Sequence, residues 1–289
     1  MKKTYVLVAI ILIVSLFVLT GCSKKEDNSA ENTVKNVVSS NSTSNTTKTE
    51  NTIDYEAAAE EQMALPKKGE TIAIIKVKNF GDIKVKFFKN VAPKAVENFI
   101  NHSKEGYYDG LTFHRVIDEF MIQGGDPTGT GTGGESIWGD GFGTELDKTL
   151  VPYRGSLCMA MSSLPNSIGS QFFITQANYS SSMESQLKKS GYPADLLKEY
   201  KKYGGYLSLY MQYTVFGQVF EGMDVVDKIA KVKTGSVTTE NGVQEDKPIE
   251  DVVISTIEVT TYKEDSSNTV TNTTTTNSVT NTSTNEILK

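Results

Sequence analysis

The chain has 289 residues, of which 38% are hydrophobic, and it carries a formal net charge of −6. This length is sufficient for one good-sized domain and would allow two. The acidic balance argues against nucleic acid as a partner, because a phosphate-binding surface needs clustered Lys and Arg. With only two histidines and no cysteine pair at zinc spacing, the sequence predicts no metal site.

The N-terminus has the pattern of a targeting segment. Lys2 and Lys3 precede an apolar run at 6–19, which has the length of a signal-peptide core and is short for a membrane span. The run ends in Leu-Thr-Gly-Cys, which resembles a bacterial lipobox. We therefore expect a lipoprotein signal peptide at 1–21, acylation of Cys22 (palmitate among the chains), and a location on the extracytoplasmic face of the cell membrane. The alternative is an ordinary anchor helix in which Cys22 is incidental.

Two polar segments flank the central part of the chain. Residues 22–68 are rich in Asn, Ser, Thr, Lys and Glu, and residues 263–289 are rich in Thr and Asn. Such compositions bury too little apolar surface to offset the entropy of ordering, so we expect a disordered tether and a disordered tail. The folded domain is expected at 69–262.

Short apolar segments alternate with turn residues within 69–262. They predict eight strands, at 71–78, 82–88, 111–117, 120–124, 157–161, 171–176, 213–220 and 252–260. Two further segments, 92–100 and 222–232, have apolar residues at helical spacing. The pattern favours a mainly β antiparallel barrel or sandwich with capping helices. Residues 179–206 read as an insertion, helical over about 183–202.

An arginine in the apolar run at 113–117 is the least expected residue of the chain. Arg115 cannot lose its charge, and a buried charge without partners is costly. If the run is a strand, Phe113 and Arg115 share one face while His114 and Val116 share the other. A fixed cation beside apolar side chains suits a ligand that is partly apolar and partly rich in carbonyls, such as a proline-containing peptide.

Three other motifs indicate no separate chemistry. Residues 129–134 match G-x-G-x-x-G, but no helix follows, so a glycine-rich loop that lets a peptide approach is the better interpretation than a nucleotide site. Ser170 lacks the G-x-S-x-G context of a serine hydrolase. Cys158 lies in an apolar run and is expected to be a small core side chain.

Five segments taken together resemble the cyclophilin family of peptidyl-prolyl cis-trans isomerases, in its bacterial lipoprotein form. They lie at 113–117, 120–126, 131–134, 170–174 and 213–219, and the resemblance extends from about 71 to 260. It implies a closed eight-stranded antiparallel barrel capped by two helices. It also implies isomerisation of X-Pro bonds in proline-containing polypeptides, with no cofactor and a monomeric enzyme.

The resemblance also implies roles for individual residues. Arg115 corresponds to the catalytic arginine, and Gln123 to the glutamine that orients it and the substrate. The pocket for the proline ring corresponds to Phe120, Met121, Phe173 and Leu209, with Tyr213 where many members have histidine. The groove for the residues before proline corresponds to Gly131, Thr132, Ala160, Met161 and Gln171.

Two positions depart from the family pattern. Met161 replaces a common asparagine, and Ser208 stands where eukaryotic members often have tryptophan, which affects the expectation of cyclosporin binding rather than of catalysis. The resulting hypothesis is a lipid-anchored isomerase that assists the folding of exported proteins. The alternative, motivated by the insertion and the polar tails, is a non-catalytic extracytoplasmic peptide-binding chaperone or interaction lipoprotein.

Overall fold

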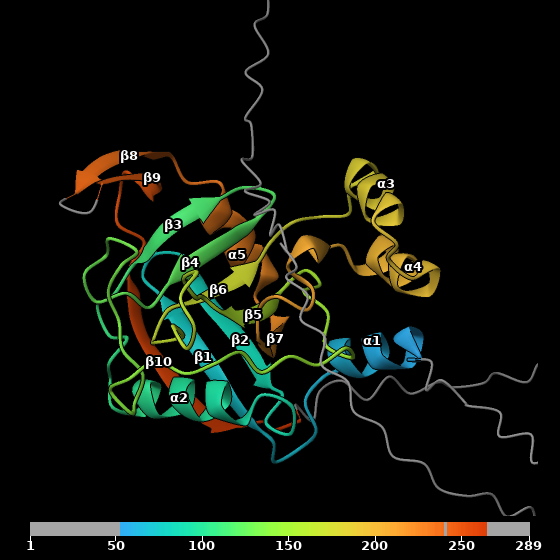
Figure 1. Cartoon of the computed structure of the whole chain (residues 1–289). Helices are drawn as coiled ribbons and strands as arrows, with labels where there is room; N and C mark the ends of the chain where they lie inside the picture. Colours follow the sequence, from blue (N-terminus) through green and yellow to red (C-terminus); the bar gives the residue numbers. More distant parts are fainter. Residues whose placement is uncertain (1–52, 240–241, 265–289) are drawn as a thin grey trace, which may run out of the picture. The chain divides into compact units, whose positions relative to one another are not determined.

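The computed structural model describes residues 53–239 and 242–264 (Figure 1). The expected signal peptide, Cys22, nearly all of the tail and most of the tether lie outside these residues. The described part contains an eight-stranded sheet, a two-stranded sheet, five α-helices and one 3-10 helix. None of its helices combines the length and the apolar character needed to cross a membrane.

The large sheet is antiparallel and contains every strand that the sequence predicts, with ends shifted by a few residues. Its strand order is β10-β1-β2-β7-β5-β6-β4-β3. The bounds are β1 Thr71–Val77, β2 Gly81–Phe87, β3 Phe113–Ile117, β4 Met121–Gly124, β5 Ser156–Met159, β6 Phe172–Thr175, β7 Val215–Glu221 and β10 Ile254–Thr261.

The sheet curls strongly but does not form the closed barrel that we expected. Its two ends, β3 and β10, share no ladder; one isolated bridge between Thr112 and Val253 connects the segments before them. The strand β9 (Gly242–Pro248) of a hairpin lies against β3 instead. The prediction of a closed eight-stranded barrel was therefore wrong, and a curled half-barrel takes its place.

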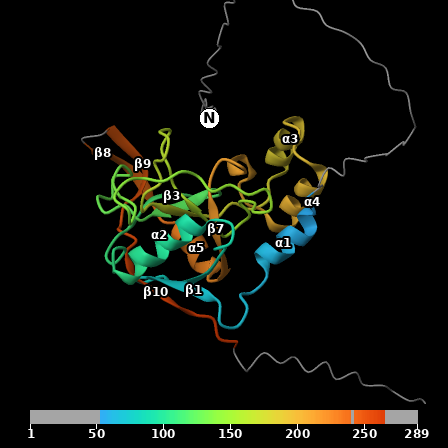
Figure 2. The ribbon, with the colours of Figure 1, turned by 60° about the horizontal axis from the view of Figure 1, so that its bottom comes forward.

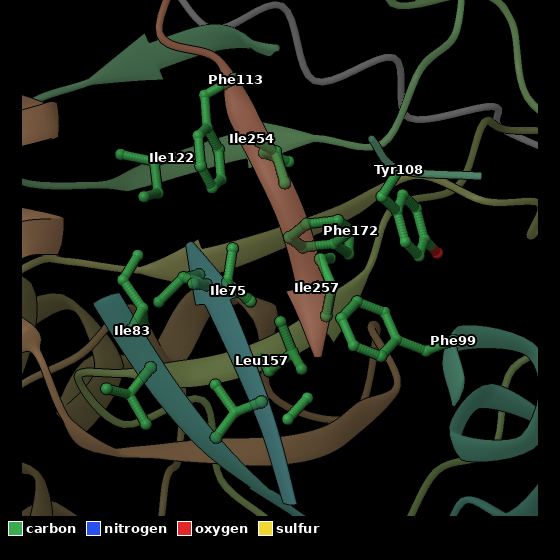
Figure 3. Close-up of a cluster of buried hydrophobic side chains, with 14 of the residues drawn as sticks. Ile75, Ile83, Phe99, Tyr108, Phe113, Ile122, Leu157, Phe172, Ile254 and Ile257 are labelled. Carbon is green, nitrogen blue, oxygen red and sulfur yellow. The ribbon is translucent and has the colours of Figure 1, made fainter. Parts of the chain in front are cut away.

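The two predicted capping helices, α2 (Pro93–Lys104) and α5 (Met223–Ala230), pack on the main core. Aromatic rings dominate this core: Phe99 of α2 lies 5.2 Å from both Tyr108 and Phe172 between ring centroids. Figure 3 shows these rings next to aliphatic side chains of the strands, including Ile75 and Leu157. Burial of this apolar surface is the main favourable contribution to folding.

The number of helices exceeds the prediction, because three further α-helices pack beside the sheet. The insertion is helical as expected, with α3 (Ser181–Lys189) and α4 (Ala194–Tyr203). The helix α1 (Tyr55–Met63) falls inside the segment that we expected to be disordered, so that prediction was wrong for this stretch. Figures 1 and 2 both show α1, α3 and α4 together on one side of the sheet.

A small hairpin of β8 (Thr234–Thr239) and β9 was not predicted either. Its residues are mostly polar and give no alternating apolar pattern. In Figures 1 and 2 the hairpin stands at the end of the sheet nearest β3, and β9 contacts that strand.

Polar contacts fix α1 to the sheet. Gln62 is 1% exposed, and its amide nitrogen donates to Val151 O (2.7 Å), Ser156 Oγ (3.1 Å) and Gln218 Oε1 (3.2 Å). Its amide oxygen accepts from Val151 N at 3.0 Å. The Lys86 Nζ donates to Glu61 O and Ala64 O at the C-terminal end of the helix, where carbonyl groups lack helical partners. Burial lowers the pKa of Lys86.

We predict that Gln62→Ala lowers the free energy of unfolding by about 1–3 kcal/mol, because it removes the partners of several buried polar groups at once. Urea unfolding at neutral pH measures the change. The matched control is Gln186→Ala, an exposed glutamine on α3, for which the expected change is within about 0.5 kcal/mol. Equal effects of the two substitutions would contradict a special role for Gln62.

Candidate active site

A β-bulge in β3 determines which way Arg115 points. Phe113 pairs with Gly124 of β4, but Arg115 pairs with the preceding residue, Gln123, so one extra residue, His114, stands between them. Phe113 and Val116 therefore both face the main core. Arg115 lies on the opposite face and is 39% exposed in its side chain. The expectation that Phe113 and Arg115 share a face was wrong, because the extra residue changes the alternation.

Three side chains of the predicted site lie in one row across neighbouring strands. Arg115 of β3 pairs with Gln123 of β4, which pairs with Phe173 of β6. The Gln123 amide nitrogen donates to Gln171 Oε1 at 2.8 Å, and Gln171 Nε2 donates to two carbonyls of the glycine-rich loop. Within the described residues no hydrogen bond joins Gln123 to Arg115. Gln123 is thus fixed beside the arginine by Gln171.

The glycine-rich loop is held by one buried carboxylate. Asp126 accepts hydrogen bonds from Thr128 N and Oγ1, from Gly131 N at 2.6 Å and from Gly133 N at 3.2 Å. Burial alone would raise the pKa of Asp126, but these hydrogen bonds outweigh it and lower the pKa. A side chain at Gly133 would place its Cβ 2.4 Å from Asp126 Oδ1. The loop is tightly packed and presents backbone groups beside Arg115.

The predicted proline pocket forms a separate apolar cluster on the same face of the sheet. Its buried members include Met121 (1% exposed), Phe173 (5%) and Leu209 (8%). Phe120, Ala160 and Tyr213 are partly buried against them, and the Tyr213 ring meets Phe173 edge-on at 5.6 Å. Cys158 is buried there as the small core residue that we expected.

The side chain of one predicted groove residue is directed away from the apolar cluster. Met161 packs partly buried against the main core and is not part of the apolar cluster of Met121 and Phe173. The structure does bring Gly131 and Thr132 together with Arg115 and Gln123, as lining residues of one cavity of about 390 Å³.

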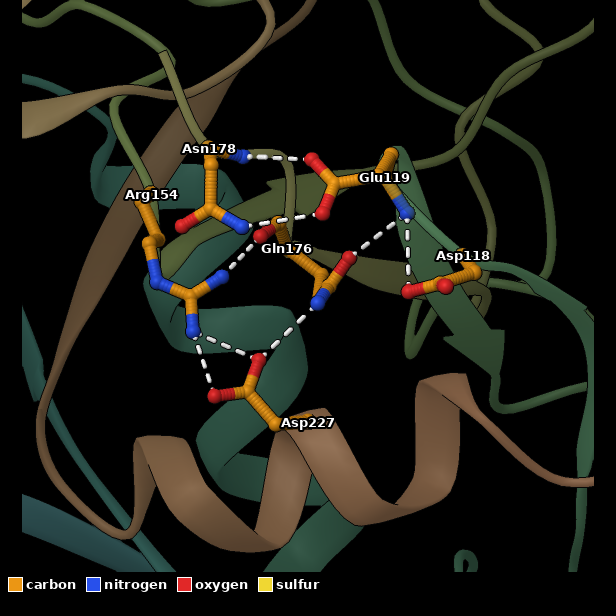
Figure 4. Close-up of polar contacts among 6 residues, drawn as sticks. All are labelled: Asp118, Glu119, Arg154, Gln176, Asn178 and Asp227. Atoms are coloured by element: carbon orange, nitrogen blue, oxygen red, sulfur yellow. Dashed lines mark hydrogen bonds and ion pairs between the residues drawn. The ribbon is translucent and has the colours of Figure 1, made fainter.

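A polar network supports the turn that carries Phe120 (Figure 4). Arg154 donates to both carboxylate oxygens of Asp227 (2.5 and 2.6 Å), and Gln176 Nε2 donates to Asp227 Oδ1 at 2.9 Å. Gln176 also accepts from Glu119 N through its side chain and donates its backbone N–H to Phe120 O. Burial alone would raise the pKa of Asp227, but the bonds from Arg154 and Gln176 lower it.

One charged neighbour of the arginine had no signal in the sequence. Asp246 of β9 places Oδ2 3.9 Å from Arg115 Nε, and its side chain is 38% exposed. The cavity beside Arg115 is closed on this side by the hairpin residues Gly242, Val243, Glu245 and Asp246. Asp246 has a backbone φ of 61° and lies within the register shift of the hairpin, between the paired residues Gln244 and Lys247. Only a prediction of the polar hairpin itself could have located these residues.

The nearest histidine is not arranged for proton transfer. His114 is 1% exposed, and burial, the largest influence on it, lowers its pKa to about 4. It is therefore neutral at physiological pH. Among the described residues no group of His, Cys, Asp and Glu side chains could hold a metal ion. What the face offers is a fixed cation, amide and backbone hydrogen-bonding groups, and an apolar pocket.

Comparison with known proteins identifies this arrangement. Residues 72–259 match the family model described as cyclophilin type peptidyl-prolyl cis-trans isomerase. A protein of Staphylococcus saprophyticus, provisionally named a peptidyl-prolyl cis-trans isomerase, is 47% identical over 192 residues, which cover 66% of this chain and 93% of the relative. A Staphylococcus aureus protein of the same name is 47% identical over 189 residues, covering 65% and 91%.

Solved structures give the same result. The crystal structure of a cyclophilin-type peptidyl-prolyl cis-trans isomerase from Cryptosporidium parvum matches with a TM-score of 0.52 and 32% identity, over 67% of this chain and 99% of that one. A second crystal structure, of the same protein in the presence of the dipeptide Ala-Pro, matches with a TM-score of 0.51 and 33% identity, over 66% and 99%. The chain belongs to the cyclophilin family and is a peptidyl-prolyl cis-trans isomerase.

We predict that the stability of the enzyme falls as the pH drops from about 6.5 to 4. In this window the unfolded chain protonates His114, whose ordinary pKa is 6.5, while the folded chain, with a pKa of about 4, does not. The full loss from this residue is roughly 3 kcal/mol. Urea unfolding at pH 7 and pH 4.5 measures it, and His114→Gln should show a smaller difference. An unchanged difference in the variant would contradict the prediction.

Proposed function

We propose that the enzyme accelerates X-Pro rotation by stabilising the twisted amide with Arg115. The peptide bond resists rotation by about 18–20 kcal/mol, because its C–N bond has partial double-bond character. In the twisted state the proline nitrogen loses conjugation and becomes a hydrogen-bond acceptor. A donor aimed at this nitrogen binds the transition state in preference to both planar states, and such differential binding is what raises the rate.

The main observation in support of this proposal is the position of Arg115. Its guanidinium is permanently charged, part-exposed, and in the same row as Gln123 and the pocket residue Phe173. Because the bulge turns it away from the core, its N–H groups are available to a ligand on this face. Gln123, fixed by Gln171, lies beside it and orients the substrate.

The apolar cluster binds the proline ring. Phe120, Met121, Phe173 and Leu209 form its walls, with Tyr213 at the edge. While the ring is held, the preceding carbonyl swings past Arg115. Gly131, Thr132, Gln171 and Ala160 contact the residues before proline, and Met161 does so through its backbone. The relative solved in the presence of Ala-Pro supports proline-containing peptides as the substrates.

The cellular setting is the second part of the proposal. The lipobox-like end of the apolar run at 6–19 supports cleavage before Cys22 and lipidation of its thiol. Two or more acyl chains give stable anchoring, since each buried methylene contributes about 0.8 kcal/mol. The enzyme then acts as a folding catalyst for exported or surface proteins on the extracytoplasmic face of the cell membrane.

We predict that Arg115→Ala lowers kcat/KM by about 10²–10³, comparable to the loss of one preorganised transition-state donor. NMR exchange of an Ala-Pro peptide, or a protease-coupled assay, measures the rate. Arg115→Lys keeps the charge but not the planar fork, so it should restore only part of the activity. Lys228→Ala, an exposed lysine of α5, is the control and should be fully active. Equal rates for wild type and Arg115→Ala would refute the mechanism.

We predict that Cys22→Ala releases the protein from membranes or leaves it unprocessed, because the acylated thiol is the attachment point. Fractionation of cells that produce the full chain, followed by mass measurement of its N-terminus, checks this. The isomerase rate of the released protein should equal that of wild type. Unchanged membrane partitioning and an unmodified Cys22 would overturn the proposed anchoring and leave the catalytic proposal intact.

A further inference from the structure

One segment of the chain lies between the proline pocket and the helices beside it. Residues 206–213, called the wall segment below, include the 3-10 helix η1 (Leu207–Leu209). The helices α1, α3 and α4, called the annex, are built around a hydrophobic core separate from the main one. This annex core contains Tyr55, Ala59, Val151, Tyr153, Leu187, Leu196, Leu197, Tyr200 and Leu207.

The wall segment contributes side chains to both clusters. Leu207 is fully buried in the annex core, while Leu209, two residues later, is 8% exposed in the proline-pocket cluster. Between them Ser208 is exposed. In a 3-10 helix of three residues per turn, positions two apart point in well separated directions. The turn is therefore held between two cores, with one leucine in each.

Further residues of the wall segment line the pocket. The Tyr206 ring lies 4.3 Å from that of Phe120, and Tyr213 meets Phe173 edge-on. Tyr213 N donates to Leu209 O at 3.2 Å, which ties the end of the segment to its turn. One side of the proline pocket thus comes from the wall segment, and the other comes from β4 and β6.

Backbone hydrogen bonds to Pro152 and Ala177, which lie outside the annex helices, hold the chain at the start of the wall segment. Tyr206 N donates to Pro152 O at 3.0 Å, and Gly205 N donates to Ala177 O at 2.9 Å. Gly205 approaches Tyr153 so closely that a Cβ would lie 2.5 Å from Tyr153 Cα. The end of α4 is therefore pressed against the chain below it.

Helix α1 reaches the wall segment directly. The hydroxyls of Tyr55 and Tyr210 are 3.2 Å apart, and that of Tyr210 donates to Lys148 O at 2.9 Å. Lys198 of α4 pairs with Glu56 of α1 at 2.9 Å. Since α1 lies outside the residues 72–259 that match the family model, this support is an addition to the family domain.

We infer that the annex positions one wall of the proline pocket, with Leu207 as the principal positioning residue, and so sets the affinity for the substrate. The inference rests on the proposed function, because the pocket concerned is the proposed proline pocket. Leu207 does not touch the substrate. It acts by fixing the place of Leu209, Tyr206 and Tyr213.

The test separates substrate affinity from turnover in the full chain. Leu207→Ala removes the contact with the annex core and should raise KM for an Ala-Pro peptide about tenfold, with kcat within about twofold of wild type. Leu207→Met, which refills the space, should restore KM. Ile257→Ala makes a similar cavity in the main core, on β10, and should leave KM unchanged. Near-ultraviolet circular dichroism verifies that each variant is folded.

The outcomes are distinct. An unchanged KM in folded Leu207→Ala, or equal KM shifts in Leu207→Ala and Ile257→Ala, would overturn the inference. If Leu207→Ala does not fold, Tyr55→Phe serves instead, since it removes only the hydroxyl facing Tyr210; KM should rise about twofold, and an unchanged KM would overturn the inference. Failure of the proposed function gives a different result, namely equal rates for wild type and Arg115→Ala.

Discussion

One extra residue in β3 determines how the face of the sheet is used. Without the bulge at His114, strict alternation would direct Phe113 and Arg115 to the same side. Either an arginine would then enter the main core, where its charge has no compensation, or a phenylalanine would leave it. The bulge places both Phe113 and Val116 in the core and leaves the guanidinium on the opposite face. The row of Arg115, Gln123 and Phe173 depends on this local change.

The hydrogen bonds of the site make it rigid, and they leave little buried charge without a partner. Asp126 is the one nearly fully buried carboxylate of the glycine-rich loop, and four donors from this loop satisfy it. On the other side of the pocket, Asp227 with Arg154 and Gln176 fixes the turn of Phe120. Both groups carry charge that is already compensated inside the fold. In the described part of the chain, the guanidinium of Arg115 has one ion-pair partner, the part-exposed Asp246 at 3.9 Å, so it keeps capacity for a ligand. Preorganisation of this kind lowers the reorganisation needed during the reaction.

Much of the fold could be predicted from the sequence, because each of the eight strands has its own apolar pattern between turn residues. The proposal that Phe120, Met121 and Phe173 line the proline pocket rests on a resemblance of whole motifs, as it does for Leu209 and Tyr213. Helix α1 could not be predicted in the same way, because it buries Tyr55, Ala59 and Gln62 rather than an apolar stripe. The bulge leaves no mark in the apolar pattern, and Asp246 reaches the site from a polar hairpin far along the chain. The sequence could not show that the side chain of Met161 packs against the main core, because its neighbours in the chain match the groove motif.

The contacts of α1 determine where a shortened form of this protein can begin. A protein expressed from the start of the family match, near residue 72, lacks Gln62 and the rest of α1. It therefore loses hydrogen bonds of Val151, Ser156, Gln218 and Lys86. The same truncation exposes the side of α4 against which Tyr55 and Ala59 pack. The helix before the family domain and the insertion within it therefore form one packing unit, so an expressed domain that keeps α4 also needs α1.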